Sequence, residues 1–318
     1  LGGTGMKSLV YTKKMFIDTY GEVPPMIGFL GIDTDGQDKM VLKSANGQNV
    51  ELDVNEQVQL DVHGPTSFYK NNKEDFTWIP SKNVDKLKLL RNLGAGGVRS
   101  NGRFTFTINL NSVEAAVTNA IANITNANIV NNTRYQLLGN ALPEIHMVFS
   151  VCGGTGCGTF INMAYLLNKI DPNMKVSAYA VLPGVFKNLP SCKHVMPNAY
   201  GALVDLDYLM HHGIDESPIA LKYLNGSSYL IEESPFFNVM FVDNINVDHD
   251  SYSRTEDLSA LISLALVTAA GELSVAGQSI GDNFAQIVGE GRLNILNKKA
   301  WAASTGSAEL VYDSQAVG

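Results

Sequence analysis

The most constraining feature of this sequence is a run of small residues between a predicted strand and a predicted helix. Residues 150–159 read Ser-Val-Cys-Gly-Gly-Thr-Gly-Cys-Gly-Thr, with four glycines within six positions. Apolar residues at 145–149 fit a buried strand, and those at 160–167 recur with helical spacing. Glycines let a backbone approach an anion closely, and the first turn of a helix presents unpaired N–H groups and a positive dipole end. The run therefore predicts a phosphate cradle, with Thr155 and Thr159 as hydroxyl donors. A tight turn without a ligand is the alternative.

Three further turns have the composition of ligand-contacting loops. Residues 2–5 read Gly-Gly-Thr-Gly and precede a helix predicted from Met6. A strand predicted over residues 25–32 ends at the acidic run 33–36, and residues 94–97 read Gly-Ala-Gly-Gly. Loops at the carboxyl ends of parallel strands meet in one crevice, so we expect these turns to converge. For residues 33–36, an ordinary Asp-Gly turn is the alternative.

The order of these four segments resembles that of the tubulin/FtsZ superfamily, whose signature loop is written GGGTG[ST]G. Here Cys152 replaces the first glycine of that loop and Cys157 replaces its Ser or Thr. The resemblance implies a bacterial or phage tubulin-like GTPase that binds GTP or GDP with Mg²⁺. It assigns nucleotide contacts to residues of all four loops and of one later helix: Gly2, Gly3, Thr4, Gly5, Asp33, Asp35, Gly94, Ala95, Gly96, Gly97, Cys152, Gly153, Gly154, Thr155, Gly156, Cys157, Gly158 and Asn198.

The same resemblance gives some of these residues particular roles. Asp35 matches an aspartate that lies near the metal, whereas Asp33 stands where asparagine is usual. Residues 94–97 resemble the loop that senses the terminal phosphate. Asn198 either touches the nucleotide or caps its helix. A side chain at Gly154 is expected to fill phosphate space, so Gly154→Val should abolish nucleotide binding without unfolding the chain.

The sequence around Phe284-Ala285 resembles the loop NxDFADV of bacterial relatives, which completes the nucleotide site of the next subunit in a filament. Aligned on this pair, Asn283 and Gln286 occupy the positions of the two acids, and Asp282 and Glu290 are the nearest carboxylates. A neutral amide can orient water but cannot act as a carboxylate base. We therefore expect hydrolysis that is slow or that uses Asp282 or Glu290.

Repetition of strand, glycine-rich loop and helix predicts an α/β fold with a parallel sheet flanked by helices. The resemblance divides the chain into a nucleotide-binding domain (1–255), a central connecting helix (256–276) and the beginning of a second α+β domain (277–318). In this interpretation residues 301–312 form the first strand of the second domain. Because no strand precedes the loop at residue 2, we also expect further residues upstream.

Composition narrows the classes of partner. The 318 residues carry 23 basic and 31 acidic side chains, a formal charge of −8, which argues against a generally basic nucleic-acid-binding surface. Three cysteines, an odd number, suggest a reducing compartment. The longest apolar stretch, 258–270, is too short to span a bilayer. We therefore expect a cytoplasmic protein with no membrane partner.

Two functions from different classes fit these features. The first is a cytoskeletal GTPase whose main partner is itself: it assembles head to tail, and GTP is hydrolysed at the interface between subunits. The second is a nucleotide-binding scaffold or regulatory module that forms no long filaments and hydrolyses little or no GTP. A dinucleotide-binding Rossmann enzyme is disfavoured, since no well-spaced GxGxxG follows the first strand.

Overall fold

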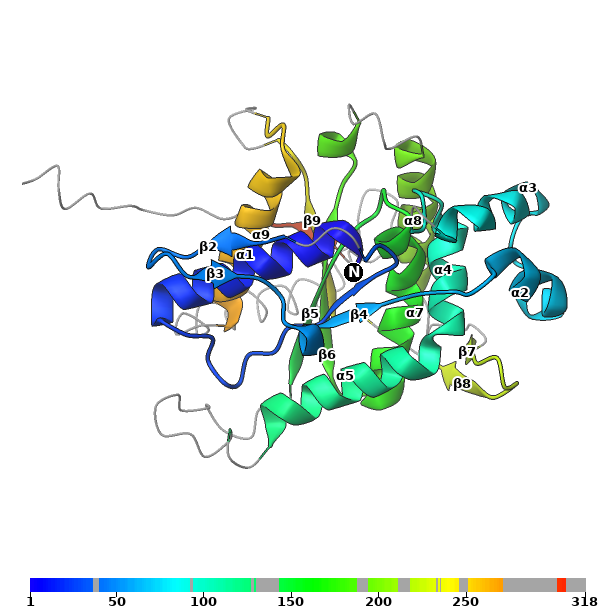
Figure 1. Ribbon diagram of the computed structural model, residues 1–318, viewed down its shortest axis with the longest axis horizontal. Helices are drawn as coiled ribbons and strands as arrows, with labels where there is room; N and C mark the ends of the chain where they lie inside the picture. Colours follow the sequence, from blue (N-terminus) through cyan, green and yellow to red (C-terminus); the bar gives the residue numbers. More distant parts are fainter. Residues whose placement is uncertain are drawn as a thin grey trace, which may run out of the picture.

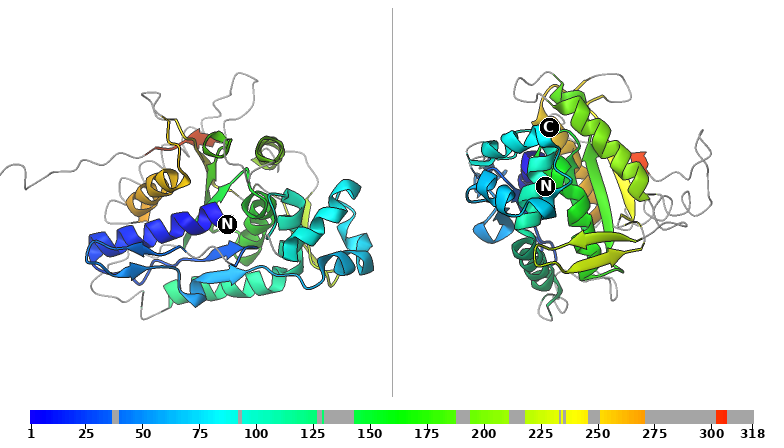
Figure 2. Two further views of the ribbon diagram at one scale, coloured as in Figure 1. Left: turned by 45° about the horizontal axis from the view of Figure 1, so that its top comes forward. Right: turned by 90° about the vertical axis from the view of Figure 1, so that its right-hand side faces the viewer.

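The computed structural model has a parallel sheet between two layers of helices, as the sequence predicts (Figure 1). One layer contains the blue helix α1, and the green helix α7 lies on the opposite side of the sheet (Figure 2). The structure describes residues 1–36, 40–91, 94–126, 129, 143–187, 194–210, 218–232, 234, 236–245, 251–270 and 302–306.

The main sheet has four parallel strands in the order β10-β9-β6-β5. Their bounds are Glu144–Ser150 for β5, Lys175–Val181 for β6, Asn238–Val242 for β9 and Ala302–Ser304 for β10. All residues of β6 after Lys175 are buried, as expected for a parallel sheet covered on both faces.

Strand β10 corrects one expectation. Residues 301–312 were predicted to open a second domain, but Ala302–Ser304 pairs in parallel with Val239–Phe241 of β9. These three residues therefore extend the main sheet beyond β9. The division of the chain into domains stays a prediction.

Short strands lie outside this sheet. β1 (Gly31–Asp33) pairs in parallel with β4 (Gln57–Gln59), and it begins at Gly31, later than the predicted start at residue 25. The other short strands form two antiparallel pairs: β2 (Leu42–Lys43) with β3 (Asn49–Val50), and β7 (Ile219–Lys222) with β8 (Ser228–Ile231).

Helices cover both faces of the sheet. The α-helices are α1 (Gly2–Tyr20), α2 (Pro65–Asn71), α3 (Ser81–Val84), α4 (Arg99–Ile108), α5 (Leu110–Thr125), α7 (Thr155–Ile170), α8 (Val195–Met210) and α9 (Thr255–Ala270). In the described ranges, short 3₁₀ helices lie at Val54–Glu56, Lys73–Phe76, Asp85–Arg91 and Gly184–Phe186. Within the described part of the chain, no helix is both long and apolar enough to cross a bilayer.

The first helix also differs from prediction. A loop was expected at residues 2–5, but α1 already begins at Gly2. A Cβ on Gly5 would lie only 2.7 Å from the carbonyl oxygen of Val148 in β5. Gly5 thus allows close packing of the first turn against the sheet, and the N–H groups of this turn have no acceptor within the helix.

The core lies between the sheet and α7. Phe149 of β5 and Phe160 of α7 are fully buried and stack with ring centroids 4.6 Å apart. A second aromatic cluster joins α2, the following 3₁₀ helix and α4, where the rings of Phe76 and Phe104 lie 4.7 Å apart. These contacts fix β5, α7 and α4, the elements from which the glycine-rich loops project.

Candidate functional site

The glycine-rich run leads directly from β5 into α7. Ser150 ends the strand, and its hydroxyl accepts a hydrogen bond from the backbone N–H of Cys152 at 3.0 Å. Helix α7 begins at Thr155. Its N-cap residue is Gly154, which has no side chain that could accept hydrogen bonds from the N–H groups of the first turn. The N–H groups of this turn and the positive end of the helix dipole are suited to an anion.

Three glycines of the run are needed for packing. A Cβ on Gly154 would lie 2.6 Å from the Cβ of Ala95, and on Gly156 or Gly158 it would lie 2.8 or 2.3 Å from a backbone oxygen of a neighbouring segment. Such distances are shorter than van der Waals contact, so a side chain at any of them would push loops apart.

Gly153 differs from these three, and the difference corrects the expectation for Gly154. No heavy atom of the described residues lies within 4 Å of a Cβ built on Gly153 or on Gly97, and one on Gly3 meets only Asp33 Oδ2, at 3.9 Å. The space predicted beside Gly154 is filled by the 94–97 turn. Open space lies instead beside Gly153 and Gly97, which come from two loops, and beside Gly3, which lies in the first turn of α1.

The 94–97 turn requires its glycines. Gly94, Gly96 and Gly97 have φ angles of 53°, 58° and 68°, a region that other residues seldom occupy. The backbone N–H of Val98 closes the turn by donating to the carbonyl of Ala95 at 3.0 Å. The turn lies directly against the 153–154 backbone, as the predicted convergence of these loops requires.

Thr34 joins three loops, and the sequence analysis gave it no role. Its hydroxyl oxygen lies 2.6 Å from that of Thr155 and accepts a hydrogen bond from the N–H of Ala95 at 2.8 Å. The Thr155 hydroxyl also bonds with Asp33. The only sequence signal for Thr34 was its position between two acids. Thr159 was also predicted to donate its hydroxyl to a ligand. It is fully buried, so its hydroxyl cannot reach a ligand and this prediction is wrong.

The two predicted acids have different surroundings. Asp33 is 7% exposed and accepts a hydrogen bond from the N–H of Thr34 at 2.7 Å. Burial raises the pKa of Asp33, and hydrogen bonds from Thr155 and the backbone oppose that rise. Asp35, in contrast, is exposed.

Asp35 fits a role as a single Mg²⁺ ligand. Over the described ranges, no three His, Cys, Asp or Glu side chains gather as a metal site would need. Mg²⁺ commonly takes only one or two carboxylates, with the remaining ligands from water and substrate phosphates. The residues present are thus compatible with Mg²⁺ bound together with a nucleotide.

The first turn of α1 lies against the first turn of α7. The backbone nitrogen of Leu1 donates to the carbonyl of Val148 at 2.6 Å, and a Cβ on Gly2 would lie 2.8 Å from the nitrogen of Gly156. Thr4 lies in the same turn, and its carbonyl accepts from the Ser8 hydroxyl at 3.0 Å. Two positive helix ends therefore adjoin one space, which suits a ligand with several negative charges.

The two cysteines of the run are buried. Burial raises the pKa of Cys157 to about 12, so its thiol stays protonated at neutral pH. Cys152 contributes its backbone to the loop, and any ligand contact at Cys157 is likewise limited to backbone atoms.

Asn198 neither caps α8 nor lies on the open side of the loops. The helix begins at Val195, so Asn198 is already one turn inside it. Its amide nitrogen donates to the carbonyl oxygens of Cys152 at 2.8 Å and Gly97 at 2.9 Å, with the Gly153 oxygen at 3.2 Å. The side chain of Asn198 thus links the 94–97 turn to the 152–154 loop through their carbonyl groups. Its position in the sequence did not predict this contact.

A half-buried ion pair lies one turn further along α1. Lys7 Nζ lies 3.4 Å from the carboxylate of Glu256 in the first turn of α9. A hydrogen bond from its own backbone N–H, together with the Lys7 ammonium, lowers the pKa of Glu256. The pair links α1 to the first turn of α9, two helices that pack against each other extensively.

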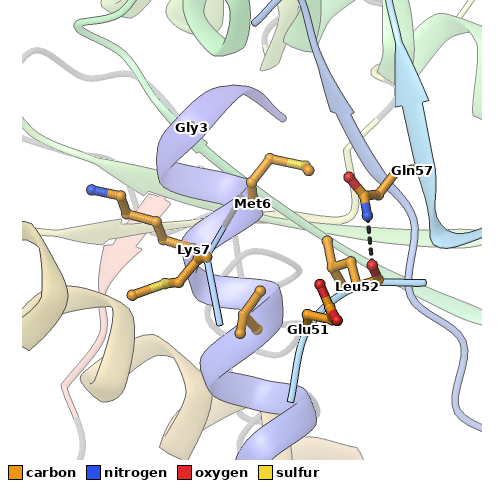
Figure 3. A pocket seen from close by; sticks show the side chains of 8 residues that line it. Gly3, Met6, Lys7, Glu51, Leu52 and Gln57 are labelled. Atoms are coloured by element: carbon orange, nitrogen blue, oxygen red, sulfur yellow. Dashed lines mark hydrogen bonds between the residues drawn. The ribbon is translucent and has the colours of Figure 1, made fainter. Parts of the chain in front are cut away.

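A small recess adjoins the same turn of α1 on the side of residues 40–57 (Figure 3). Gly3 and Met6 line it together with Leu52 and Gln57, whose amide donates to the Leu52 carbonyl at 2.5 Å. The recess has room for roughly one water molecule. It is therefore not the space that a nucleotide would fill.

The four residues predicted for hydrolysis, Asp282, Asn283, Gln286 and Glu290, lie outside the described residues, as does the end of the predicted central helix. Helix α9 confirms a long helix after β9, over Thr255–Ala270.

The sequence model described as "Tubulin like" matches residues 1–313. The chain belongs to the tubulin-like family. Among solved structures, CetZ from Methanosaeta thermophila strain DSM 6194 is 14% identical with a TM-score of 0.46, over 85% of this chain and 52% of CetZ. TubZ from Bacillus thuringiensis serovar israelensis, in a GTPγS-form protofilament, is 12% identical with a TM-score of 0.39, over 82% of this chain and 53% of TubZ. The chain thus spans about half the length of each. No curated protein matches it.

Proposed function

We propose that this chain binds GTP or GDP with Mg²⁺ in the cytoplasm and assembles head to tail into filaments, with GTP hydrolysed at the interface between subunits. The observation that carries the proposal is the set of open glycine faces at Gly153, Gly97 and Gly3, beside the first turns of α1 and α7. Membership of the tubulin-like family supports the choice of a guanine nucleotide.

The proposed phosphate contacts divide between the loops. The backbone N–H groups of residues 153–157 and of the first turn of α1 bind the phosphate chain, because both helix ends present unpaired donors there. The N–H of Gly158 instead donates to the carbonyl of Gly154 at 3.1 Å. The 94–97 turn receives the terminal phosphate. Thr34 aligns this turn with α7 through its bonds to Ala95 and Thr155.

Asp35 is the proposed protein ligand for Mg²⁺. The ion, when bound, neutralises charge on the phosphate oxygens during phosphoryl transfer. The attacking water would be oriented by residues 282–290 of the neighbouring subunit. In this scheme residues 1–255 bind the nucleotide, 256–276 connect and 277–318 begin the hydrolytic domain, apart from Ala302–Ser304 in the main sheet.

The Lys7–Glu256 pair supports guanine over adenine. Guanine offers N1–H and an amino group on one edge, a donor pair that matches the two oxygens of a carboxylate. Adenine has no N1–H. Glu256 is ionised at neutral pH, since its pKa is lowered, and it pairs with Lys7, which lies one turn of α1 beyond Gly3.

Light scattering and negative-stain electron microscopy test this function. The whole chain is incubated with Mg²⁺ and GTP, GTPγS or GDP, and Gly153→Ala serves as the control that folds without binding. Filaments that form with GTP or GTPγS but not in the control support the proposal.

The second function, a scaffold without filaments, is favoured by Asn283 and Gln286 at the positions of the two acids. It predicts tight GTP binding by particles that stay monodisperse, with little phosphate released. The same experiment therefore separates the two functions.

A further inference from the structure

One side chain joins both glycine-rich loops from behind. Asn198 is 8% exposed, and its amide nitrogen reaches the carbonyl oxygens of Gly97, Cys152 and Gly153 at 2.9, 2.8 and 3.2 Å. These carbonyls belong to two loops that are more than fifty residues apart in the sequence. The amide thus fixes the position of one loop relative to the other.

The helix that carries Asn198 is itself held firmly. Arg99, the first residue of α4, forms an ion pair with Asp205 of α8 and donates from Nε to the carbonyl of Cys157 at 2.9 Å. The thiol of Cys157 lies 3.5 Å from the carbonyl of Asn198. Helices α4, α7 and α8 therefore form a rigid base for the Asn198 amide.

The orientation of the tied peptides gives this contact a function. In a trans peptide, the carbonyl and the next residue's N–H point in opposite directions. Because Asn198 binds the Cys152 and Gly153 carbonyls, it turns the N–H groups of Gly153 and Gly154 away from α8. No heavy atom of the described residues lies within 4 Å of a Cβ built on Gly153, between these two donors in the sequence.

We propose that Asn198 is a positioning residue that sets the N–H groups of the 152–154 loop and the distance to the 94–97 turn, so that both loops contact one triphosphate. This proposal rests on the proposed function and goes beyond it, because Asn198 acts through the loops and does not touch the nucleotide. A triphosphate that spans both loops depends on their spacing more than a diphosphate does.

The loops retain other ties when Asn198 is removed. Thr34 still holds Ala95 and Thr155, and the contact of Cys157 with residue 198 uses the backbone carbonyl, which alanine keeps. We therefore expect Asn198→Ala to fold. Asn238 provides a matched control, since it is an asparagine of 5% exposure that begins β9, at the opposite end of the sheet's strands.

The experiment compares Asn198→Ala and Asn238→Ala in the whole chain. Thermal unfolding measures the loss of stability, titration measures the affinities for GTPγS and GDP, and amide hydrogen exchange without nucleotide reports on residues 94–98 and 152–155. We expect Asn198→Ala to lower GTPγS affinity about tenfold and GDP affinity less than threefold, with faster exchange in both loops. Asn238→Ala should change each affinity less than twofold and leave the loops unaffected.

The proposal is overturned if both variants lose affinity equally, if Asn198→Ala weakens GTPγS and GDP alike, or if loop exchange is unchanged. If the unmodified chain binds no nucleotide, the proposed function fails and the role in binding fails with it. Exchange in the nucleotide-free protein still shows whether Asn198 ties the loops, so the two failures are distinguishable.

Discussion

Adjacent glycines in the 150–159 run should respond to alanine in opposite ways. A Cβ on Gly153 meets no heavy atom of the described chain within 4 Å, whereas one on Gly154 lies 2.6 Å from the Cβ of Ala95 and 3.0 Å from the nitrogens of Gly97 and Val98. Neither glycine has a positive φ angle, so alanine strains the backbone at neither. Comparing the two alanine variants therefore shows why each position requires a residue without a side chain.

The expected magnitudes follow from these distances. Gly154→Ala overpacks the contact between two loops, and such insertions cost about 1–3 kcal/mol of folding free energy. Gly153→Ala should leave stability unchanged or raise it by about 0.4–1 kcal/mol, since alanine restricts the unfolded chain. In the ligand complex, however, its methyl group would occupy the space of a phosphate oxygen. We expect Gly153→Ala to weaken GTPγS binding more than tenfold.

Thermal unfolding and titration with GTPγS, on the same preparations, measure both effects. The predicted pattern is a stable Gly153→Ala that does not bind and a destabilised Gly154→Ala. Unchanged GTPγS affinity in Gly153→Ala would refute the assignment of the open space to phosphate. Equal destabilisation of both variants would show that the space beside Gly153 is not open in solution.

Three further predictions concern charge. Burial raises the folded-state pKa of Asp33 above its ordinary 3.8, so the folded chain loses stability as pH rises from 3.8 through that raised pKa. Asp33→Asn should therefore be more stable than the unmodified chain at pH 7. Thermal unfolding at lower pH should show a smaller difference in stability between the two. Glu256→Gln should reduce the preference for GTP over ATP in competition titrations, because an amide is a weaker acceptor for N1–H; an unchanged ratio argues against base contact. Asp282→Ala should slow phosphate release without weakening GTPγS binding, and if turnover is intact, Glu290→Ala is the next variant.

Local spacing predicted the elements that lead to the site. Apolar residues before and after the glycine-rich run correctly predicted β5 and α7, because the periodicity of strands and helices can be recognised from the spacing of nearby residues. The loops at Thr34, Ala95 and Gly154 also converge as expected, although β1 lies outside the main sheet and the 94–97 turn follows a 3₁₀ helix.

What remained hidden depends on neighbours that are distant in the sequence. Gly153 and Gly154 are identical in sequence terms, and only the position of Ala95 shows which one faces open space. Asn198 looked like a helix cap because capping preference is local, whereas its three acceptors lie in other loops. The pairing of Ala302–Ser304 with β9 likewise joins segments that no periodicity connects.

A structure of the whole chain with GTPγS and Mg²⁺, determined by crystallography or cryo-electron microscopy, is the most direct measurement of the central claim. The account predicts phosphate density against the backbone of Gly153 and Gly97, beside the first turns of α1 and α7, with Mg²⁺ near Asp35. Nucleotide density elsewhere on the molecule, or side chains occupying the space beside Gly153, would contradict it.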